Sequence, residues 1–275
     1  MKMTKTLTAI ALGLGILAGA GNAQAAGAGV TPPSKDWSFN GIFGTYDRAA
    51  LQRGFQVYRN VCANCHSMDL IAFRNLSALG YNEDEVKAIA ASYEVQDGPN
   101  DDGDMFSRPA TPADRWPAPF ANDKAAAAAN GGATPPDLSL ITKARGAGGD
   151  SALRVSLFHP SGFALGADYL YALLTGYVEN PPADFSLPAG KYYNTYFPGH
   201  SISMAPPLGE GIVDYEDGTA ATTEQMASDV TTFLAWASEP ELEHRKNLGI
   251  KVMLFLIVLT AMLYALKRKI WSDLH

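Results

Sequence analysis

The chain has 275 residues, 47% of them hydrophobic, with two cysteines and a formal net charge of −7 at pH 7. Two cysteines exclude a disulfide-rich scaffold. The negative charge argues against nucleic-acid binding, because it repels a phosphate backbone, and fits either a cationic partner or solubility alone.

The first 25 residues have the pattern of a secretory signal peptide. Lys2 and Lys5 precede a short apolar run rich in Gly and Ala, and Ala23, Gln24 and Ala25 form an A-x-A end. We expect cleavage after Ala25; an N-terminal membrane anchor is the alternative, which the shortness of the run disfavours. Loss of two lysines would take the net charge from −7 to −9. The mature domain is expected at 26–247, outside the cytoplasm.

Two helices are predicted in the N-terminal half. Asp47 can cap the first, which leads directly into Cys62, and Asn82 can cap the second, whose first turn is acidic. The apolar residues at helical spacing are Leu51, Gly54, Phe55 and Tyr58 in the first and Val86, Ile89, Ala90 and Tyr93 in the second.

The pentapeptide from Cys62 to His66 carries both cysteines of the chain. The spacing C-x-x-C-H is the attachment signal for c-type haem, in which two thiols add to the porphyrin and the adjacent imidazole becomes an iron ligand. A thioredoxin-like site would need a βαβ setting, and a zinc site would need further ligands at suitable spacing. We therefore predict one covalent haem held by Cys62 and Cys65, with His66 as an axial ligand.

Long loops are predicted at 97–137, which contains seven prolines, and at 180–218, which is rich in Pro, Gly and Tyr. Further helices are expected near Asp150 and Asp168. A capping box of Thr222 and Gln225 begins another, which ends before Pro240. The predicted fold class is mostly α, with long loops wrapping a centre that side chains alone do not fill.

A membrane span is predicted at 248–266, where 19 residues contain one charge, Lys251. The alternative, a buried core helix, is weaker because the segment is apolar on every face. The cationic residues 267–269 follow, with Trp271 as an interfacial anchor, so the tail 267–275 is expected in the cytoplasm. Arg245 and Lys246 on the other flank weaken that assignment.

The second axial ligand is approached by elimination among the methionines. Met204 lies in GHSISMAPPL, where two prolines restrict the backbone, whereas Met105 lies in a charged loop. Met204 is the preferred ligand. Three histidines are the alternatives: His159, His200 and His244. Other methionines lie in the signal peptide or in the membrane span. Met226 lies on the apolar face of a predicted helix, and Met68 is too close to His66 in sequence to reach the opposite face of the haem.

Five segments together resemble the cytochrome c1 family, the haem subunits of cytochrome bc1 complexes, in the form found in α-proteobacteria. They are YDRAALQRGFQVYRNVCANCHSM, PPDLSLITKAR, DYLYALLTGY, YYNTYFPGHSISMAPPL and the C-terminal anchor. The resemblance runs in order from about Trp37 to Trp271. It implies a cytochrome c-like haem domain with a single C-terminal transmembrane helix.

The resemblance also implies roles for particular residues. Met204 matches the family's axial methionine, and Arg145 is expected to reach a haem propionate, although a surface arginine is the plain alternative. Pro135, Pro136 and Tyr58 would line the haem pocket, though each could be ordinary packing. Some bacterial relatives carry an additional cysteine pair before the ligand methionine, and this chain has none. The loop 183–203 is therefore expected to be held by packing, chiefly of its prolines with Tyr192, Tyr193, Tyr196 and Phe197.

The function implied by the resemblance is electron relay within a complex that contains cytochrome b, in a parent complex expected to be dimeric. Electrons would come from the Rieske iron–sulfur protein and pass to a soluble cytochrome c, which the acidic surface would attract. Acidic clusters at 83–85, 97–104 and 210–217 are more often solvated faces or loops than docking sites. A membrane-tethered shuttle cytochrome and a haem enzyme with an open iron position are the alternatives.

Overall fold

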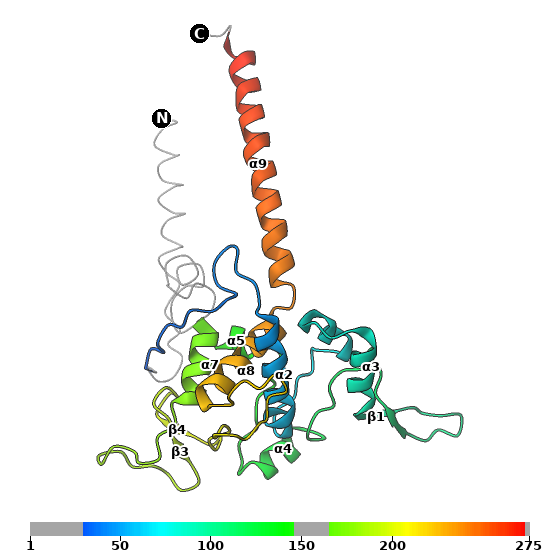
Figure 1. Ribbon diagram of the computed structural model, residues 1–275, viewed down its shortest axis with the longest axis vertical. Helices are drawn as coiled ribbons and strands as arrows, with labels where there is room; N and C mark the ends of the chain where they lie inside the picture. The colour runs from blue at the N-terminus through cyan, green and yellow to red at the C-terminus, as the bar shows by residue number, and fades with distance from the viewer. Residues whose placement is uncertain (1–29, 146–164, 273–275) are drawn as a thin grey trace, which may run out of the picture.

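The structure is a computed structural model that describes residues 30–145 and 165–272. The expected signal peptide, the helix near Asp150 and His159 lie outside these ranges. Within them, helices and loops form a domain from which one long helix, α9, projects (Figure 1). The predicted fold class, mostly α with a single apolar C-terminal helix, is confirmed.

Two helices form the centre of the domain, and both begin where their capping residues predict. The side chain of Asp47 accepts hydrogen bonds from the backbone N–H groups of Ala49 and Ala50 at the start of α2 (Arg48–Asn60). Thr222 Oγ1 accepts from Gln225 N, 3.1 Å away, at the start of α8 (Thr223–Ser238). The reciprocal half of the predicted capping box is wrong, because the Gln225 side chain donates to Asp229 instead.

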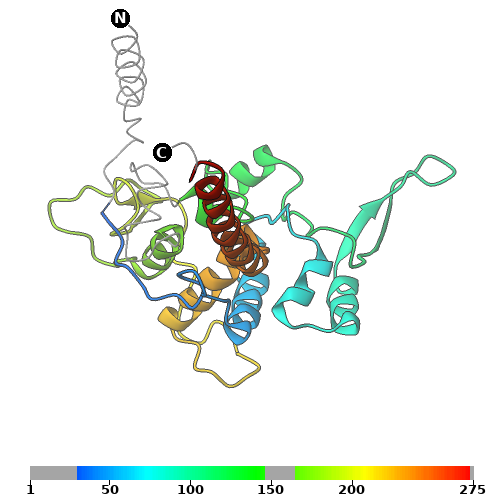
Figure 2. The ribbon, with the colours of Figure 1, turned by 90° about the horizontal axis from the view of Figure 1, so that it is seen from above.

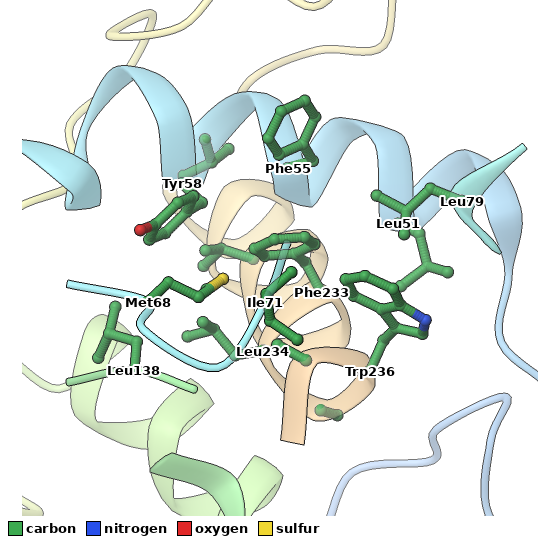
Figure 3. Packing of buried hydrophobic residues seen from close by; sticks show 14 of the residues in the cluster. Leu51, Phe55, Tyr58, Met68, Ile71, Leu79, Leu138, Phe233, Leu234 and Trp236 are labelled. Carbon is green, nitrogen blue, oxygen red and sulfur yellow. The ribbon is translucent and has the colours of Figure 1, made fainter. Parts of the chain in front are cut away.

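Close approach of α2 and α8 depends on Gly54. A Cβ atom at this position would lie 2.1 Å from the carbonyl oxygen of Asp229, so only glycine allows the two backbones to come this near. Beside this contact, the ring of Phe233 lies 5.7 Å from that of Phe55 and 5.5 Å from that of Tyr58. Figure 3 shows Tyr58, Phe233 and Met68 close together beside α2 and α8, with Phe55 further along α2. The core therefore lies directly behind the end of α2 that leads to Cys62.

A buried ion pair adds a polar connection between the same two helices. Arg53 donates from Nε and Nη2 to the two carboxylate oxygens of Asp229, at 2.8 and 3.1 Å. The side chain of Asp229 is only 1% exposed and that of Arg53 is 15% exposed. Arg53 also reaches Asp217, 2.8 Å away in the loop before α8. The pair fixes the register of α2 on α8 across 176 residues of sequence.

The segment after the pentapeptide packs on the outer side of α2. The pentapeptide itself begins with a short 3₁₀ helix, η1 (Cys62–Asn64), and the segment after it contains a second, η2 (Phe73–Leu79), followed by α3 (Glu83–Ala91). Asn82 caps α3 as predicted, here in a complete capping box with Glu85. The ring of Trp116 packs against Phe55, Tyr58, Phe73 and Tyr93, so it joins this segment to the core.

The prediction of an unbroken loop at 97–137 is wrong. Strands β1 (Glu94–Asp97) and β2 (Phe106–Pro109) pair antiparallel, with Glu94 opposite Pro109, and α4 (Asp123–Ala129) follows. Arg108 ties the hairpin together through Asp97 and Asp114. The alanine run forms α4 because alanine has the highest helix propensity and Asn122 caps it. The hairpin extends sideways from the domain (Figures 1 and 2).

Two shorter helices and a small sheet complete the domain. The elements are α5 (Ile141–Ala144), α7 (Leu165–Thr175), β3 (Tyr192–Tyr193) and β4 (Ser201–Ile202). The short strands interrupt the loop predicted at 180–218, and they pair antiparallel with Tyr192 opposite Ile202. The helix expected near Asp168 is α7, which is described from Leu165, and Asp168 lies in its first turn. The Asp168 side chain is buried and accepts a hydrogen bond from Trp37 Nε1 at 2.7 Å, so it makes a tertiary contact.

The long helix α9 (Leu242–Ile270) has 29 residues, which corresponds to about 43 Å at about 1.5 Å per residue. It contains the predicted span 248–266 and extends beyond it on both sides. Its most apolar stretch is entirely unburied, so it is not a core helix of the described domain. Lys267, Arg268 and Lys269 lie in its last turn. Length, composition and exposure fit a transmembrane anchor.

Candidate haem site

The pentapeptide forms one compact turn at the end of α2. The backbone N–H groups of Cys65 and His66 both donate to the carbonyl oxygen of Cys62, at 3.1 and 2.9 Å. Both cysteines are free thiols, Cys62 partly buried and Cys65 exposed. Burial, and then the neighbouring Cys65, raises the pKa of the Cys62 thiol to about 12. A dithiol redox site needs a cysteine with a lowered pKa, and burial acts on Cys62 in the opposite direction.

His66 is oriented by one hydrogen bond. Its Nδ1 lies 2.8 Å from the carbonyl oxygen of Pro136, which can only accept, so Nδ1 carries the proton and donates. Burial lowers the pKa of His66, which favours the neutral ring. The lone pair of Nε2 is then available to a metal. This is the arrangement in which metal-ligating histidines are usually held.

Asp137 clamps the Pro136 segment onto the segment that follows His66. Its carboxylate accepts from Ser67 Oγ and Asp69 N, each at 2.8 Å, and from Ser139 N at 2.8 Å. Burial alone would raise the pKa of Asp137, but these hydrogen bonds outweigh it and lower the pKa. Asp137 is therefore held as a carboxylate that positions the partner of the His66 imidazole.

Sequence reasoning missed Asp137, although a signal for it is present. Asp137 and Ser139 have the spacing of an Asx turn, in which an aspartate accepts from the backbone two residues further on. Nothing in the local sequence shows that the same carboxylate also reaches Ser67 and Asp69, because those residues lie about 70 positions away.

Tyr58 and Pro136 occupy different kinds of position. Tyr58 is fully buried behind the pentapeptide, and its pKa is raised by burial first and by Cys62 second. Figure 3 shows Tyr58 beside Met68, which is also fully buried. Pro136 is exposed, and its contact with the site is the carbonyl bond to His66. Pro135, directly before it, is partly buried.

The structure separates the methionine candidates by burial. Met68 and Met226 are fully buried in the core, and Met105 is 60% exposed beside the β1–β2 turn. Met204 is partly buried two residues after β4. The hydroxyl of Tyr177 donates to the Met204 carbonyl oxygen over 3.1 Å. Among the described methionines before α9, Met204 combines partial burial with an anchored loop, as an axial ligand requires.

The histidine alternatives for which the structure gives a position have other contacts. His200 has a positive φ of 56°, its Nδ1 lies 3.2 Å from the Asn194 carbonyl oxygen, and its ring stacks on Tyr193 at 5.5 Å. His244 is exposed in the first turn of α9, 3.8 Å from Glu241. Both contacts suit structural roles in a loop and at a helix end.

A buried asparagine holds the loop before Met204. Asn194 Nδ2 donates to the Leu173 carbonyl oxygen at 2.8 Å, and its Oδ1 accepts from Tyr196 N and Phe197 N. The side chain is completely buried. The expectation that aromatic packing is the chief restraint is therefore incomplete. Tyr193 does pack on Phe185 and His200, but the hydrogen bond from Asn194 to Leu173 attaches the loop to α7.

Arg145 is exposed at the end of α5. Burial raises the pKa of Tyr169 on α7, and the positive charge of Arg145 partly opposes that rise. Helices α5, α7 and α8 contact one another, and α8 also packs on α2. The element that carries Met204 is thus connected to the element that carries His66 through a continuous core.

The residues present fit a haem better than a metal held by side chains alone. Within 30–145 and 165–272, no three Cys, His, Asp or Glu side chains gather as a metal site. Free thiols, an oriented imidazole and a methionine in an anchored loop are the kinds of donor that a c-type haem with His/Met ligation uses.

The acidic clusters are partly engaged within the domain. Glu83 and Asp84 pair with Lys87 on α3, Asp97 pairs with Arg108, and Asp217 pairs with Arg53. These contacts account for several of the charges as local structure, and the exposed remainder keeps the surface acidic.

Comparison with known proteins gives a consistent result. The sequence pattern of the Cytochrome C1 family matches residues 37–274. The chain is 54% identical over 260 residues to "Cytochrome c1" of Rhodospirillum rubrum, covering 89% of both chains. It is 49% identical to "Cytochrome c1 1, heme protein, mitochondrial" of Arabidopsis thaliana, covering 90% of this chain and 74% of the relative. It is 48% identical to "Cytochrome b-c1 complex catalytic subunit, mitochondrial" of Candida albicans, covering 91% and 81%.

Proposed function

This chain belongs to the cytochrome C1 family, and from that premise we propose that it carries one covalent haem c with His/Met ligation and relays electrons from the Rieske iron–sulfur protein to a soluble cytochrome c. Family membership already makes it a haem-containing electron-transport subunit of a cytochrome bc1 complex. The attachment, the ligands and the electron route are the finer parts of the proposal.

The observation that carries the proposal is the Nδ1 bond from His66 to the Pro136 carbonyl oxygen. It orients the imidazole immediately after two free cysteines, so that Nε2 can ligate iron while the thiols of Cys62 and Cys65 form thioether links. When bound, haem c supplies a one-electron ferric/ferrous couple. The protein residues would hold the haem, provide its ligands and keep water from its buried side.

Met204 and Arg145 complete the proposed site. The thioether of Met204 would be the second protein ligand of the iron, which would raise the reduction potential and leave no position open to exogenous ligands. Tyr177 positions Met204 through its backbone carbonyl. Arg145 pairs with a haem propionate, whose charge needs a cationic donor. Tyr58 supplies the buried wall behind Cys62.

The proposed partners are cytochrome b in the membrane, the Rieske protein as electron donor and soluble cytochrome c as acceptor, within a dimeric complex. The acidic charge of the chain supports attraction of a basic acceptor. The proposed orientation places the haem domain in the periplasm and the basic end of α9 in the cytoplasm, as its Lys267–Lys269 cluster favours. Residues 1–25 are proposed to be a cleaved signal peptide.

The main alternative, a tethered cytochrome that swings between complexes, needs a flexible linker. Here Glu243 and Lys246 on α9 both bond to the segment before α2: Glu243 Oε1 accepts from Tyr46 N at 2.8 Å, and Lys246 Nζ donates to the Phe39 carbonyl oxygen at 2.7 Å. These contacts favour a domain seated on its anchor, as a subunit of a fixed complex requires.

Two measurements test the proposal. A denaturing gel stained for haem peroxidase activity tests covalent attachment; a mature chain without stain would overturn it. A pyridine haemochrome assay with a reduced-minus-oxidised spectrum gives the haem type and number.

The Met204→Leu substitution tests the ligand. We expect a lower midpoint potential and carbon monoxide binding to the reduced iron, with Met105→Leu as the matched control that changes neither. Unchanged behaviour of Met204→Leu would move the ligand elsewhere. Rates of electron delivery to soluble cytochrome c that are insensitive to ionic strength would contradict electrostatic attraction.

A further inference from the structure

A short loop at the base of α9 exposes two apolar side chains. Trp37 and Phe39 are buried, but Ile42 is 69% and Phe43 is 81% exposed. These are the two most exposed large apolar residues among those that the structure describes, and no residue of α9 in that set exceeds 63%. A soluble surface rarely presents two adjacent residues of this size so completely.

The loop is rigidly closed. Asn40 N donates to the Trp37 carbonyl oxygen at 2.9 Å, and Thr45 N donates to the Ser38 carbonyl oxygen at 3.0 Å. A Cβ atom at Gly44 would lie 1.9 Å from the Asn40 carbonyl oxygen, so the turn closes only with glycine there. Exposure of the two apolar side chains is therefore built into the turn.

The loop is also fastened to the membrane helix. Lys246 Nζ donates to carbonyl oxygens on both arms, at 2.7 Å to Phe39 and 3.0 Å to Gly44. Glu243, one turn earlier, accepts from Tyr46 N and pairs with Arg48. Figures 1 and 2 both show the loop beside the first turns of α9, and in Figure 1 it points in the same direction as the helix.

The fastening sets the level of the loop relative to a bilayer. Lys246 precedes Leu248, where the apolar stretch begins, by two residues, or about 3 Å along the axis. Apolar side chains at the boundary of a membrane span are stabilised in the headgroup region. A loop tip at this level, fastened to the first turns of α9, has lipid as its nearest apolar environment.

We propose that Ile42 and Phe43 insert into the lipid headgroup region at the domain end of α9, as a second membrane contact that fixes the tilt of the haem domain. With α9 as its only membrane contact, the domain and the helix could tilt together relative to the bilayer. Two contacts, joined by Lys246 and Glu243, hold one face of the domain toward the membrane surface. The proposal depends on α9 spanning the bilayer and not on the identity of the electron partners.

Site-directed spin labelling of the full haem-loaded chain in lipid nanodiscs tests this inference. Phe43→Cys is labelled with a nitroxide, and its accessibility to oxygen, which concentrates in lipid, is compared with that to a water-soluble nickel chelate. Met105→Cys is the matched control, an exposed apolar position in the hairpin that extends away from α9. Val258→Cys, in the middle of α9, is the lipid reference. Unsubstituted chain treated identically reports any labelling of Cys62 and Cys65.

We expect the ratio of oxygen to nickel accessibility at position 43 to be several-fold higher than at 105 and to approach that at 258. A ratio at 43 equal to that at 105 would place the loop in water and overturn the proposal. Low accessibility to both reagents would indicate burial against protein and would also overturn it. A water-like ratio at 258 would show that α9 does not span the bilayer, and the proposal would fall with it.

Discussion

Removing the guanidinium of Arg53 should destabilise the domain by about 3 kcal/mol. Breaking a buried ion pair by deleting one partner costs about 3–5 kcal/mol, because a charge is left buried without a counter-ion. Arg53→Met would leave the carboxylate of Asp229, which is 1% exposed, in that state. Two features place the cost at the lower end: Arg53 is 15% exposed, and Gln225 still donates to Asp229 at 2.9 Å.

The measurement is equilibrium unfolding of the full chain in detergent micelles, followed by tryptophan emission. Trp37, Trp116 and Trp236 are buried in the domain, so their emission reports its unfolding. For a domain of about 200 residues, a loss of this size lowers the melting temperature by about 6–12 °C. Lys87→Met, which removes an exposed ion pair with Glu83, is the control and should cause no measurable change.

A second substitution separates lost charge pairing from lost packing. Arg53→Met combined with Asp229→Leu removes both charges, and we expect the double variant to be within about 1 kcal/mol of the unsubstituted chain. If the effects of the two single substitutions simply add, or if Arg53→Met costs no more than Lys87→Met, the buried pair does not have the role assigned to it.

Three further predictions follow from close contacts and from one pKa shift. Gly54→Ala should cost about 3 kcal/mol in chemical unfolding, because its Cβ would lie 2.1 Å from the Asp229 carbonyl oxygen and force α2 away from α8. Asn194→Ala should also cost about 3 kcal/mol, because it leaves one carbonyl and two N–H groups without their buried partner. It should, in addition, let carbon monoxide bind the reduced haem through a loosened Met204 loop. The pKa of Asp217 is lowered from 3.8 to about 2, by the Thr219 amide first and then by Arg53. Its stabilising contribution is therefore complete above about pH 4 and is lost as the pH falls toward 2, so the difference in urea midpoint between the unsubstituted chain and Asp217→Asn should shrink over that range.

Each of these has a clear contrary outcome. Gly249→Ala on α9, where an added Cβ meets nothing within 4 Å, is the control for Gly54, and equal effects would contradict the close-approach argument. If Asn194→Ala leaves carbon monoxide binding unchanged, the hydrogen bonds of Asn194 do not hold Met204 on the iron. If the difference in urea midpoint between the unsubstituted chain and Asp217→Asn stays constant from pH 5 to about pH 2, ionisation of Asp217 does not contribute to stability.

Local sequence patterns determined the helices and the attachment turn. Asp47, Asn82 and Thr222 each cap the helix that follows, because a capping side chain acts on backbone groups two or three residues away. The pentapeptide at Cys62 and the apolar stretch of α9 are likewise contiguous. Such features can be read from the chain because the interacting groups are close in sequence. Strand pairing of 94–97 with 106–109 was missed, because it depends on a partner elsewhere in the chain.

Only the tertiary structure decided how the proposed site is oriented and supported. The imidazole of His66 is turned by a carbonyl 70 residues away, Asp137 clamps that segment in place, and Asn194 attaches the methionine loop to α7. Arg53 finds Asp229 across 176 residues. Hydrogen bonds of this kind leave no periodic trace in the sequence, because each polar side chain could be satisfied by water until packing buries it beside one partner.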